Sequence, residues 1–303
     1  MRRHIIAPRH DWRDRARDLG FAYAEIAGEP YWDETACWEF TSVEVDALDD
    51  ALAELERLTR LAADHAVRHD RHAQLGIPAA VWPLMVRSWE RQEPSLYGRM
   101  DFCWDGTGQP KLLEYNADTP TTLFESSVVQ WEWLSCAFPD MDQFNSIHEA
   151  LIAAWPKMGL PPRVHFCGMR DSAEDRGNID YLRDTAVQAG LDAPFLFVDE
   201  IGWDGRRFVD TDRAEIRAVF KLYPWEFLLR DDFGNHIAMP VRGGSSRHSG
   251  CCCPARASWP CCGNCFPAIP ICCLRFGNLA EPAAQKSRNR FLAARERTSP
   301  HRA

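Results

Sequence analysis

Polar side chains in residues 97–121 have the types and spacing that metal or anion chemistry requires. Two alternating runs flank a turn that contains an Asp-Gly pair, and this pattern predicts an antiparallel hairpin. With the turn centred near Thr107–Gly108, Asp101 falls opposite Glu114, at the short distance typical of cross-strand neighbours. Asn116 lies two residues beyond Glu114 and shares its face of the strand. The hairpin is therefore expected to gather two carboxylates and an amide oxygen.

These oxygen atoms are hard ligands, which favour Mg²⁺ over zinc or copper. Arg99 lies on the same face as Asp101 and offers a bidentate contact to a carboxylate or phosphate. Thr119 and Thr121 follow the second strand and offer hydroxyl groups to a substrate. The same spacing also fits a polar face exposed to solvent, with Asp118 and Thr119 forming a turn and a helix cap. Spacing alone names no reaction.

Helical patterns precede and follow this hairpin. Thr41-Ser42-Val43-Glu44 has the form of a capping box, and the leucines that follow recur at steps of three and four residues. This pattern predicts an amphipathic helix over about 44–68. Further helices are expected over 80–90, 123–137 and 142–155.

The second half of the chain alternates strand and helix patterns. Arg163–Cys167 reads as a strand, Glu174–Ala189 as a helix that ends at Gly190, and Phe195–Val198 as the next strand. This order predicts a parallel strand–helix–strand unit. Lys221–Tyr223 is expected to add another strand. The predicted fold class is α/β, with helices and strands mixed.

The stretch Leu84–Trp133 resembles the glutathionylspermidine synthase family, more closely its stand-alone bacterial members without an amidase domain. The similarity rests on Tyr97-Gly98-Arg99-Met100-Asp101 and on Leu113-Glu114-Tyr115-Asn116-Ala117-Asp118-Thr119-Pro120. Glu174-Asp175 and Lys221-Leu222-Tyr223-Pro224-Trp225-Glu226 resemble the family in the same order. The resemblance covers roughly residues 10–241 and implies a pre-ATP-grasp, ATP-grasp-like synthetase fold, incomplete at the C-terminus.

This resemblance implies an ATP- and Mg²⁺-dependent ligase that activates an acid as an acyl phosphate and joins it to an amine. It implies a glutathione-like acid and a polyamine-like amine as partners. By analogy, Mg²⁺ is held by Asp101, Glu114 and Asn116, the acyl phosphate is steadied by Arg99, and substrate is bound by Thr119, Thr121 and Glu174 or Asp175. Leu222 stands where the spermidine-joining enzyme has a hydroxyl residue, so the substrate pair is left open.

The composition changes abruptly near Arg242. Residues 242–303 hold ten basic and two acidic residues, and eight of the twelve cysteines lie in 251–273. Cys262 and Cys265 have the spacing of a zinc half-site, but no second pair completes it. A disulfide framework would require secretion, for which the N-terminus shows no signal.

A reading-frame error accounts for the cysteines more simply. Leucine codons of the form CTG read out of frame as the cysteine codon TGC. When permitted codons for Gly244–Leu279 are read from the third base, the cysteine clusters become leucine clusters. We therefore expect residues 1–241 to form the family-like region and 242–303 to be an out-of-frame, largely disordered tail. Family members place nucleotide-binding lysines downstream of residue 241, so the 303-residue chain is expected to lack activity.

Charge and hydropathy exclude other classes of function. The net charge of −9 argues against a generally basic nucleic-acid binder. The sequence contains no run of eighteen or more apolar residues, so it predicts no membrane-spanning helix. Four scattered cysteines in residues 1–241 fit a reducing cytoplasm. A non-catalytic module that binds a small molecule or peptide through the hairpin remains the alternative to a ligase, and the oligomeric state is not indicated.

Overall fold

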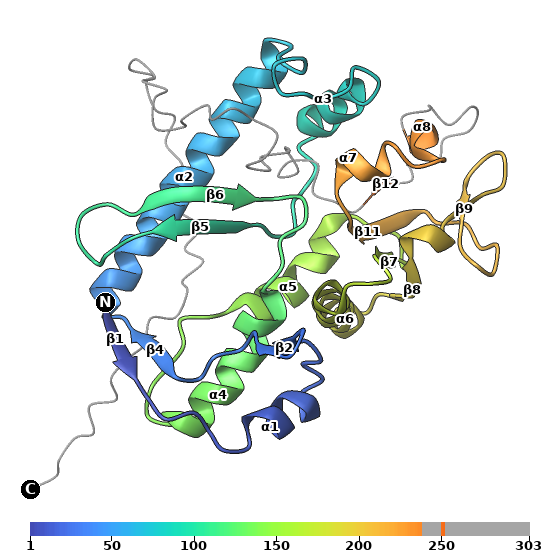
Figure 1. The fold of residues 1–303 in the computed structure, drawn as a ribbon. Coiled ribbons are helices and arrows are strands. Elements are labelled where there is room, and N and C mark those ends of the chain that lie inside the picture. Colours follow the sequence, from blue (N-terminus) through green and yellow to red (C-terminus); the bar gives the residue numbers. More distant parts are fainter. Residues whose placement is uncertain (238–249, 252–303) are drawn as a thin grey trace, which may run out of the picture.

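The computed structural model describes residues 1–237 and 250–251, and a four-stranded parallel sheet forms its core (Figure 1). The strands lie in the order β12-β11-β7-β8, and each neighbouring pair is parallel. Their bounds are His165–Gly168 for β7, Phe195–Phe197 for β8, Ala218–Leu222 for β11 and Gly250–Cys251 for β12. Helix α6 (Ala173–Gln188) connects β7 to β8. The predicted parallel strand–helix–strand unit is confirmed.

Apolar side chains cover both faces of this sheet. Phe166 and Phe220 lie in a buried cluster with side chains of α6 and of α5 (Ile147–Ala154). Cys167 and Leu196 point to the other face and pack in a second cluster with Ile216. Successive side chains of a strand alternate between the two faces, so the same strands supply both layers. Burial of these side chains is the main driving force that holds the sheet and its helices together.

Shorter elements surround the sheet. The described residues form four two-stranded antiparallel pairs: β1 (Arg2–Ile5) with β4 (Ala36–Glu39), β2 (Glu25–Ile26) with β3 (Glu29–Pro30), β5 (Arg99–Cys103) with β6 (Lys111–Asn116), and β9 (Gly202–Trp203) with β10 (Phe208–Val209). The other α-helices are α1 (Trp12–Asp18), α2 (Ser42–Arg68), α3 (Trp82–Glu90), α4 (Gln130–Ala137), α7 (Trp225–Leu228) and α8 (Gly234–Ile237). This mixture of helices and strands confirms the predicted fold class.

The long helix α2 begins at the predicted capping box. The Thr41 hydroxyl accepts a hydrogen bond from the Glu44 amide, and the Glu44 carboxylate accepts one from the Thr41 amide. These bonds satisfy two backbone donors at the helix start, so the helix begins at Ser42, two residues before the predicted position. The helix lies behind the β5–β6 hairpin, where the Tyr115 hydroxyl donates to the Glu56 carboxylate at 3.4 Å (Figure 1).

Two of the predicted helices begin in a different way from the prediction. The helix expected over 123–137 opens with a π-helical turn, η1 (Glu125–Val129), before α4. The helix expected over 142–155 begins only at Ile147. Asn145 explains this delay, because its side chain accepts from the Ile147 amide and donates to the Ser126 carbonyl. This helix, α5, continues into a 3₁₀ turn, η2 (Trp155–Met158).

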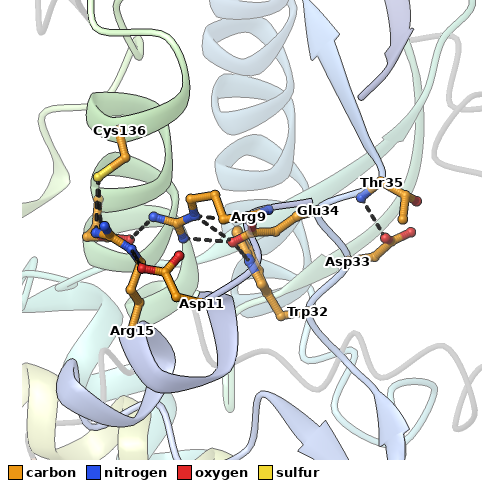
Figure 2. A network of polar contacts seen from close by, with 9 residues as sticks. Arg9, Asp11, Arg15, Trp32, Asp33, Glu34, Thr35 and Cys136 are labelled. Carbon is orange, nitrogen blue, oxygen red and sulfur yellow. Dashed lines mark hydrogen bonds and ion pairs between the residues drawn. The ribbon is translucent and has the colours of Figure 1, made fainter. Parts of the chain in front are cut away.

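A network of ion pairs fastens the N-terminal segment to α4 (Figure 2). The Arg9 guanidinium group donates to Glu34 and to Glu132, each at 2.7 Å. Arg15 donates to Glu132 and to the Cys136 sulfur atom from the other side. Glu34 is buried, and its carboxylate has the Arg9 charge as compensation. The network joins residues more than 100 positions apart, which no local pattern predicts.

None of the helices in the described ranges, 1–237 and 250–251, has the length and apolar character needed to cross a membrane. The longest of them, α2, carries charged residues along its exposed side.

Asn178 fastens α6 to the segment that follows the hairpin. Its side-chain oxygen accepts from the Leu123 amide at 2.8 Å, and its nitrogen donates to the Tyr23 hydroxyl at 3.2 Å. The residue is fully buried. Three separate parts of the chain therefore meet at one amide group.

The Asn178→Ala substitution should lower the free energy of unfolding by about 1–3 kcal/mol, because it leaves a buried backbone amide without an acceptor. Denaturation in urea measures this difference. Asn235→Ala removes the same group from an exposed position and should change the stability by less than about 0.5 kcal/mol. Equal effects of the two substitutions would contradict the role given to Asn178.

Candidate functional site

The β5–β6 hairpin carries the residues that the sequence singled out. Asp101 lies opposite Glu114, and Arg99 lies opposite Asn116. The predicted cross-strand pairing of the two carboxylates is therefore confirmed. All four side chains are half-buried or nearly so, and they lie where β6 leads into the segment before η1.

A β-bulge fixes this register. Asp101 pairs with Glu114, whereas the next residue, Phe102, pairs with Leu112. Leu113 is therefore an extra residue in β6. Without this extra residue, the register of Phe102 with Leu112 would continue to Asp101 opposite Leu113 and would separate the two carboxylates. The predicted pairing of Asp101 with Glu114 assumed regular strands, so the partners were predicted and the bulge was not.

Arg99 lies between the two carboxylates. Its Nε atom donates to Asp101 Oδ1 at 2.8 Å, and Nη2 donates to Glu114 Oε1 at 3.2 Å. Its Nη1 atom donates to the Thr121 hydroxyl at 3.3 Å. The hydrogen bonds to Asp101, together with the negative charges of both carboxylates, hold the pKa of Arg99 above its ordinary value. The guanidinium group is therefore fixed as a cation at the centre of the hairpin face.

Asn116 closes the loop that follows β6. Its Oδ1 atom accepts from the Thr119 amide at 3.1 Å, and its Nδ2 atom donates to the Thr119 carbonyl. The amide oxygen retains one lone pair for a further contact. Thr119 is thus held by its backbone, which leaves the predicted role of its hydroxyl group untested.

The donor set on this face fits Mg²⁺ better than a cation that needs a complete protein cage. Mg²⁺ uses one or two protein carboxylates and fills its other positions with water or phosphate oxygens. Asp101 and Glu114 supply two such carboxylates, exposed by 38% and 42%. Within residues 1–237 and 250–251, no group of three His, Cys, Asp or Glu side chains forms a metal-binding cluster. The roles of Asp101, Glu114 and Asn116 as metal ligands stay predictions.

A buried ion pair joins the loop after the hairpin to the central sheet. Lys221 Nζ lies 2.6 Å from Asp118 Oδ1, and both side chains are less than 5% exposed. Lys221 also donates to the Tyr223 carbonyl, and the Trp225 amide donates to Asp118 Oδ2 at 3.0 Å. Asp118 is therefore buried and is not part of the solvent-exposed polar face that the sequence left open. It fixes the loop against the end of β11.

The segment 117–124 consequently lies at the carboxyl ends of the parallel strands. Asp118 reaches the end of β11, and Leu123 is bonded to α6, which follows β7. The chain crosses from β7 to β8 on one side and returns to β11 on the other, so this edge is a topological switch point. Ligands of open α/β sheets bind at such points. The architecture thus brings the hairpin face to the ligand-binding edge of the sheet.

Glu125 is a site neighbour to which the sequence assigned no role, although residues 125–130 also resemble the glutathionylspermidine synthase family. It is 5% exposed, its Oε1 atom accepts from the Tyr31 hydroxyl at 2.9 Å, and its Oε2 atom has no hydrogen-bond partner in the described part of the chain. Burial raises the pKa of Glu125, and the charge of Glu174 raises it further. Burial likewise raises the pKa of the Tyr31 hydroxyl, which the charge of Arg99 opposes. Arg99, Tyr31 and the two glutamates therefore share one electrostatic environment.

The feature that draws attention to Glu125 is structural: it lies in a π-helical turn, and such turns are frequent at functional sites. Tyr31 comes from the N-terminal segment, too far along the chain for a spacing argument. Glu174 lies half-buried in the first turn of α6. Its predicted contact with substrate is untested, although its charge acts on the same environment as Arg99.

The predictions for residues 242–303 lie outside the described residues, except that Gly250–Cys251 form β12 beside β11. The out-of-frame origin of this tail, its disorder and the zinc alternative all stay predictions.

Glu125→Gln should remove the part of the pH dependence of stability that Glu125 contributes. The pKa of Glu125 in the folded chain is raised above the ordinary value of 4.5, so the folded state binds the proton more tightly than the unfolded state does. The contribution of Glu125 to the free energy of unfolding is therefore fully present below its ordinary pKa and is lost as pH rises through the raised pKa. Glutamine cannot ionise and still offers Tyr31 an acceptor.

The measurement is denaturation of both proteins between about pH 4 and pH 8. The free energy of unfolding of the variant minus that of the natural chain should increase with pH. A difference that stays constant over this range would contradict the assignment. Other titrating carboxyl groups are present in both proteins and cancel in the comparison.

Comparison with known proteins places these features in a family. The glutathionylspermidine synthase preATP-grasp family matches residues 3–246. A protein of Haemophilus influenzae assigned as an acid–amine ligase is 37% identical over 240 residues, which is 76% of this chain and 61% of that protein. The trypanothione synthetase of Crithidia fasciculata is 31% identical over 164 residues, 52% of this chain and 25% of that protein.

The bifunctional glutathionylspermidine synthetase/amidase of Escherichia coli is 28% identical over 223 residues, 71% of this chain and 36% of that protein. The matched part of this chain thus spans at most 61% of each of these relatives. The family match itself extends over most of the chain and includes the whole hairpin, the ion pair and the central sheet through β11. The chain therefore belongs to the glutathionylspermidine synthase preATP-grasp family.

Proposed function

We propose that residues 1–241 are part of an ATP- and Mg²⁺-dependent ligase that joins a carboxylic acid to an amine through an acyl phosphate. The observation that carries this proposal is the hairpin face, where Arg99 lies between Asp101 and Glu114. A cation beside two half-exposed carboxylates provides opposite charges at one place, as phosphoryl transfer requires. A family match that contains this hairpin supports the same reaction.

In this proposal Asp101, Glu114 and Asn116 hold Mg²⁺. When bound, the metal ion would neutralise charge on the phosphoryl oxygens. Arg99 steadies the acyl phosphate, since its planar group binds phosphate or carboxylate oxygens in pairs. No other residue on this face carries a positive charge in the described part of β5 and β6, apart from Lys111 near the turn.

The hydroxyl groups of Thr119 and Thr121 bind the acid, and Glu174 contacts a substrate from the start of α6. Thr121 supports this assignment because it already accepts a hydrogen bond from Arg99. A relative named for glutathionylspermidine synthesis supports a glutathione-like acid and a polyamine-like amine as the substrates. Leu222, at the end of β11, lacks the hydroxyl group expected of a spermidine-joining enzyme, so the amine is proposed only as a class.

We further propose that residues 242–303 are translated out of frame and that the 303-residue chain does not turn over. The basic, cysteine-rich composition that starts near Arg242 supports the first part. The nucleotide-binding lysines that the family resemblance places downstream of residue 241 support the second. Resequencing the gene across these codons tests the frame directly.

The 303-residue chain should show no ATP hydrolysis that depends on Asp101. The protein translated from the corrected frame should hydrolyse ATP when an acid substrate is present, and Asp101→Asn should lower its rate by about 10²-fold or more, because charge stabilisation is lost. Asp192→Asn removes a carboxylate from an exposed ion pair with Arg163 and should leave the rate unchanged. The assay is release of inorganic phosphate.

Two results would contradict this account. Asp101-dependent hydrolysis by the 303-residue chain would show that the tail does not abolish activity. A corrected protein that binds small molecules or peptides without hydrolysing ATP would favour the non-catalytic binding module.

A further inference from the structure

The Arg99 guanidinium group uses all three of its nitrogen atoms on side chains of the proposed site. Nε donates to Asp101 Oδ1 at 2.8 Å, while Nη2 donates to Asp101 Oδ2 at 3.1 Å and to Glu114 Oε1 at 3.2 Å. Nη1 donates to the Thr121 hydroxyl at 3.3 Å. One arginine therefore binds both carboxylates proposed to hold a metal ion and one hydroxyl group proposed to hold a substrate.

A divalent cation and Arg99 need the same oxygen atoms. Both Oδ1 and Oδ2 of Asp101 accept from the guanidinium group, as does Oε1 of Glu114. A metal ion that takes these oxygens would lie within a few ångströms of a second positive charge, and the repulsion is strong outside bulk water. The carboxylates are more exposed than Arg99, at 38% and 42% against 28%, so a cation reaches them from solvent.

We propose that Arg99 is an internal counter-ion that a divalent cation displaces from Asp101 and Glu114, so that the cation and an anionic ligand bind with positive coupling. This inference rests on the proposed placement of the metal ion at these carboxylates. The ligand classes are a hard divalent cation and a carboxylate or phosphate.

The charges of the face explain the coupling. Arg99, Asp101 and Glu114 together carry a net charge of −1, which repels an anion. A divalent cation changes this sum to +1 and frees the guanidinium fork, which then has no carboxylate partner. The hydrogen bond to the Thr121 hydroxyl keeps the released side chain beside a residue that is proposed to bind substrate. Because linkage is reciprocal, the anion must strengthen cation binding by the same factor.

The first test follows the Arg99 Nε–H signal by NMR in the 303-residue chain while Mg²⁺ alone is added. Loss of the hydrogen bond to Asp101 should shift this signal and speed its exchange with water. The Nε–H signal of Arg163, which donates to Asp192, is the internal control and should not move. Because the chain carries no substitution, this measurement does not depend on the folding of a variant. An Arg99 signal that stays unchanged as Mg²⁺ is added would overturn the proposal.

The second test measures affinities by calorimetry. Arg99→Gln should bind Mg²⁺ at least about fivefold more tightly than the natural chain, because a competing cation is removed. A residue that only shaped the metal site would weaken binding when removed. Arg163→Gln, the matched control, should leave Mg²⁺ binding unchanged. Unchanged or weaker binding by Arg99→Gln would overturn the proposal.

The third test uses inorganic phosphate as the anion. Saturating Mg²⁺ should raise its affinity for the natural chain by about 5- to 150-fold, the usual range for coupled sites. Arg99→Gln should reduce this gain, because the cation still adds positive charge but no guanidinium group is released to bind the anion. Equal phosphate affinity with and without Mg²⁺ would overturn the proposal.

These readouts separate the inference from the proposed function. If Asp101→Asn and Glu114→Gln leave Mg²⁺ binding unchanged, the metal assignment fails and the inference fails with it. If the corrected protein proves not to be a ligase, the three binding tests still stand or fail by themselves, since none requires ATP or turnover.

Discussion

The buried ion pair between Asp118 and Lys221 is the interaction on which the geometry of the site depends. It joins the loop that follows β6 to the carboxyl end of β11, and the two residues are 103 positions apart in the sequence. Moving two charges out of water costs desolvation free energy. Here this cost is offset by the short contact between the two side chains and by a backbone hydrogen-bond partner for each of them. Loss of one partner from such a pair typically destabilises a fold by about 3–5 kcal/mol.

Several residues proposed to bind ligand lie close to this pair along the chain. Asn116 and Thr119 flank Asp118, and Thr121 follows closely on the same loop. Leu222 follows Lys221 at the end of the strand. The pair therefore sets the position of the hairpin face relative to the carboxyl ends of the parallel strands. Asn178 holds the far end of the same loop, so the segment is fixed at two points.

The electrostatic design of the site follows from that placement. The hairpin presents Arg99 between two half-exposed carboxylates, and η1 supplies a buried glutamate, Glu125. The Tyr31 hydroxyl donates to Glu125 and is within the electrostatic field of Arg99. A site that holds both signs of charge in a partly buried place suits the proposed reaction, in which an acyl phosphate meets an amine. Membership of the family gives this arrangement its chemical context.

Local patterns in the sequence predicted local structure well. Alternation around an Asp-Gly turn predicted the hairpin, and the Thr41–Glu44 spacing predicted the start of α2. The βαβ unit followed from its order of patterns and the helix-ending Gly190, whose φ of 89° suits glycine. These features depend on residues close together in the chain, so periodicity and capping chemistry describe them.

Features that depend on distant partners were not predicted. A bulge at Leu113 has no local signature, although it brings Asp101 and Glu114 into opposition. Asp118 looked like a turn residue because its partner, Lys221, lies in another element. The burial of Glu125 likewise depends on the N-terminal segment and α6, which spacing within 97–137 cannot describe.

Hydrogen–deuterium exchange of the Lys221→Met variant tests the central claim most directly. The pair is held to fix segment 117–124 on the sheet edge, so the amides of this segment should exchange at least about tenfold faster in the variant, while those of α2 stay unchanged. Asp118→Leu combined with Lys221→Met removes both charges and should recover part of the protection. Unchanged exchange in 117–124, or equal acceleration throughout the chain, would contradict the account.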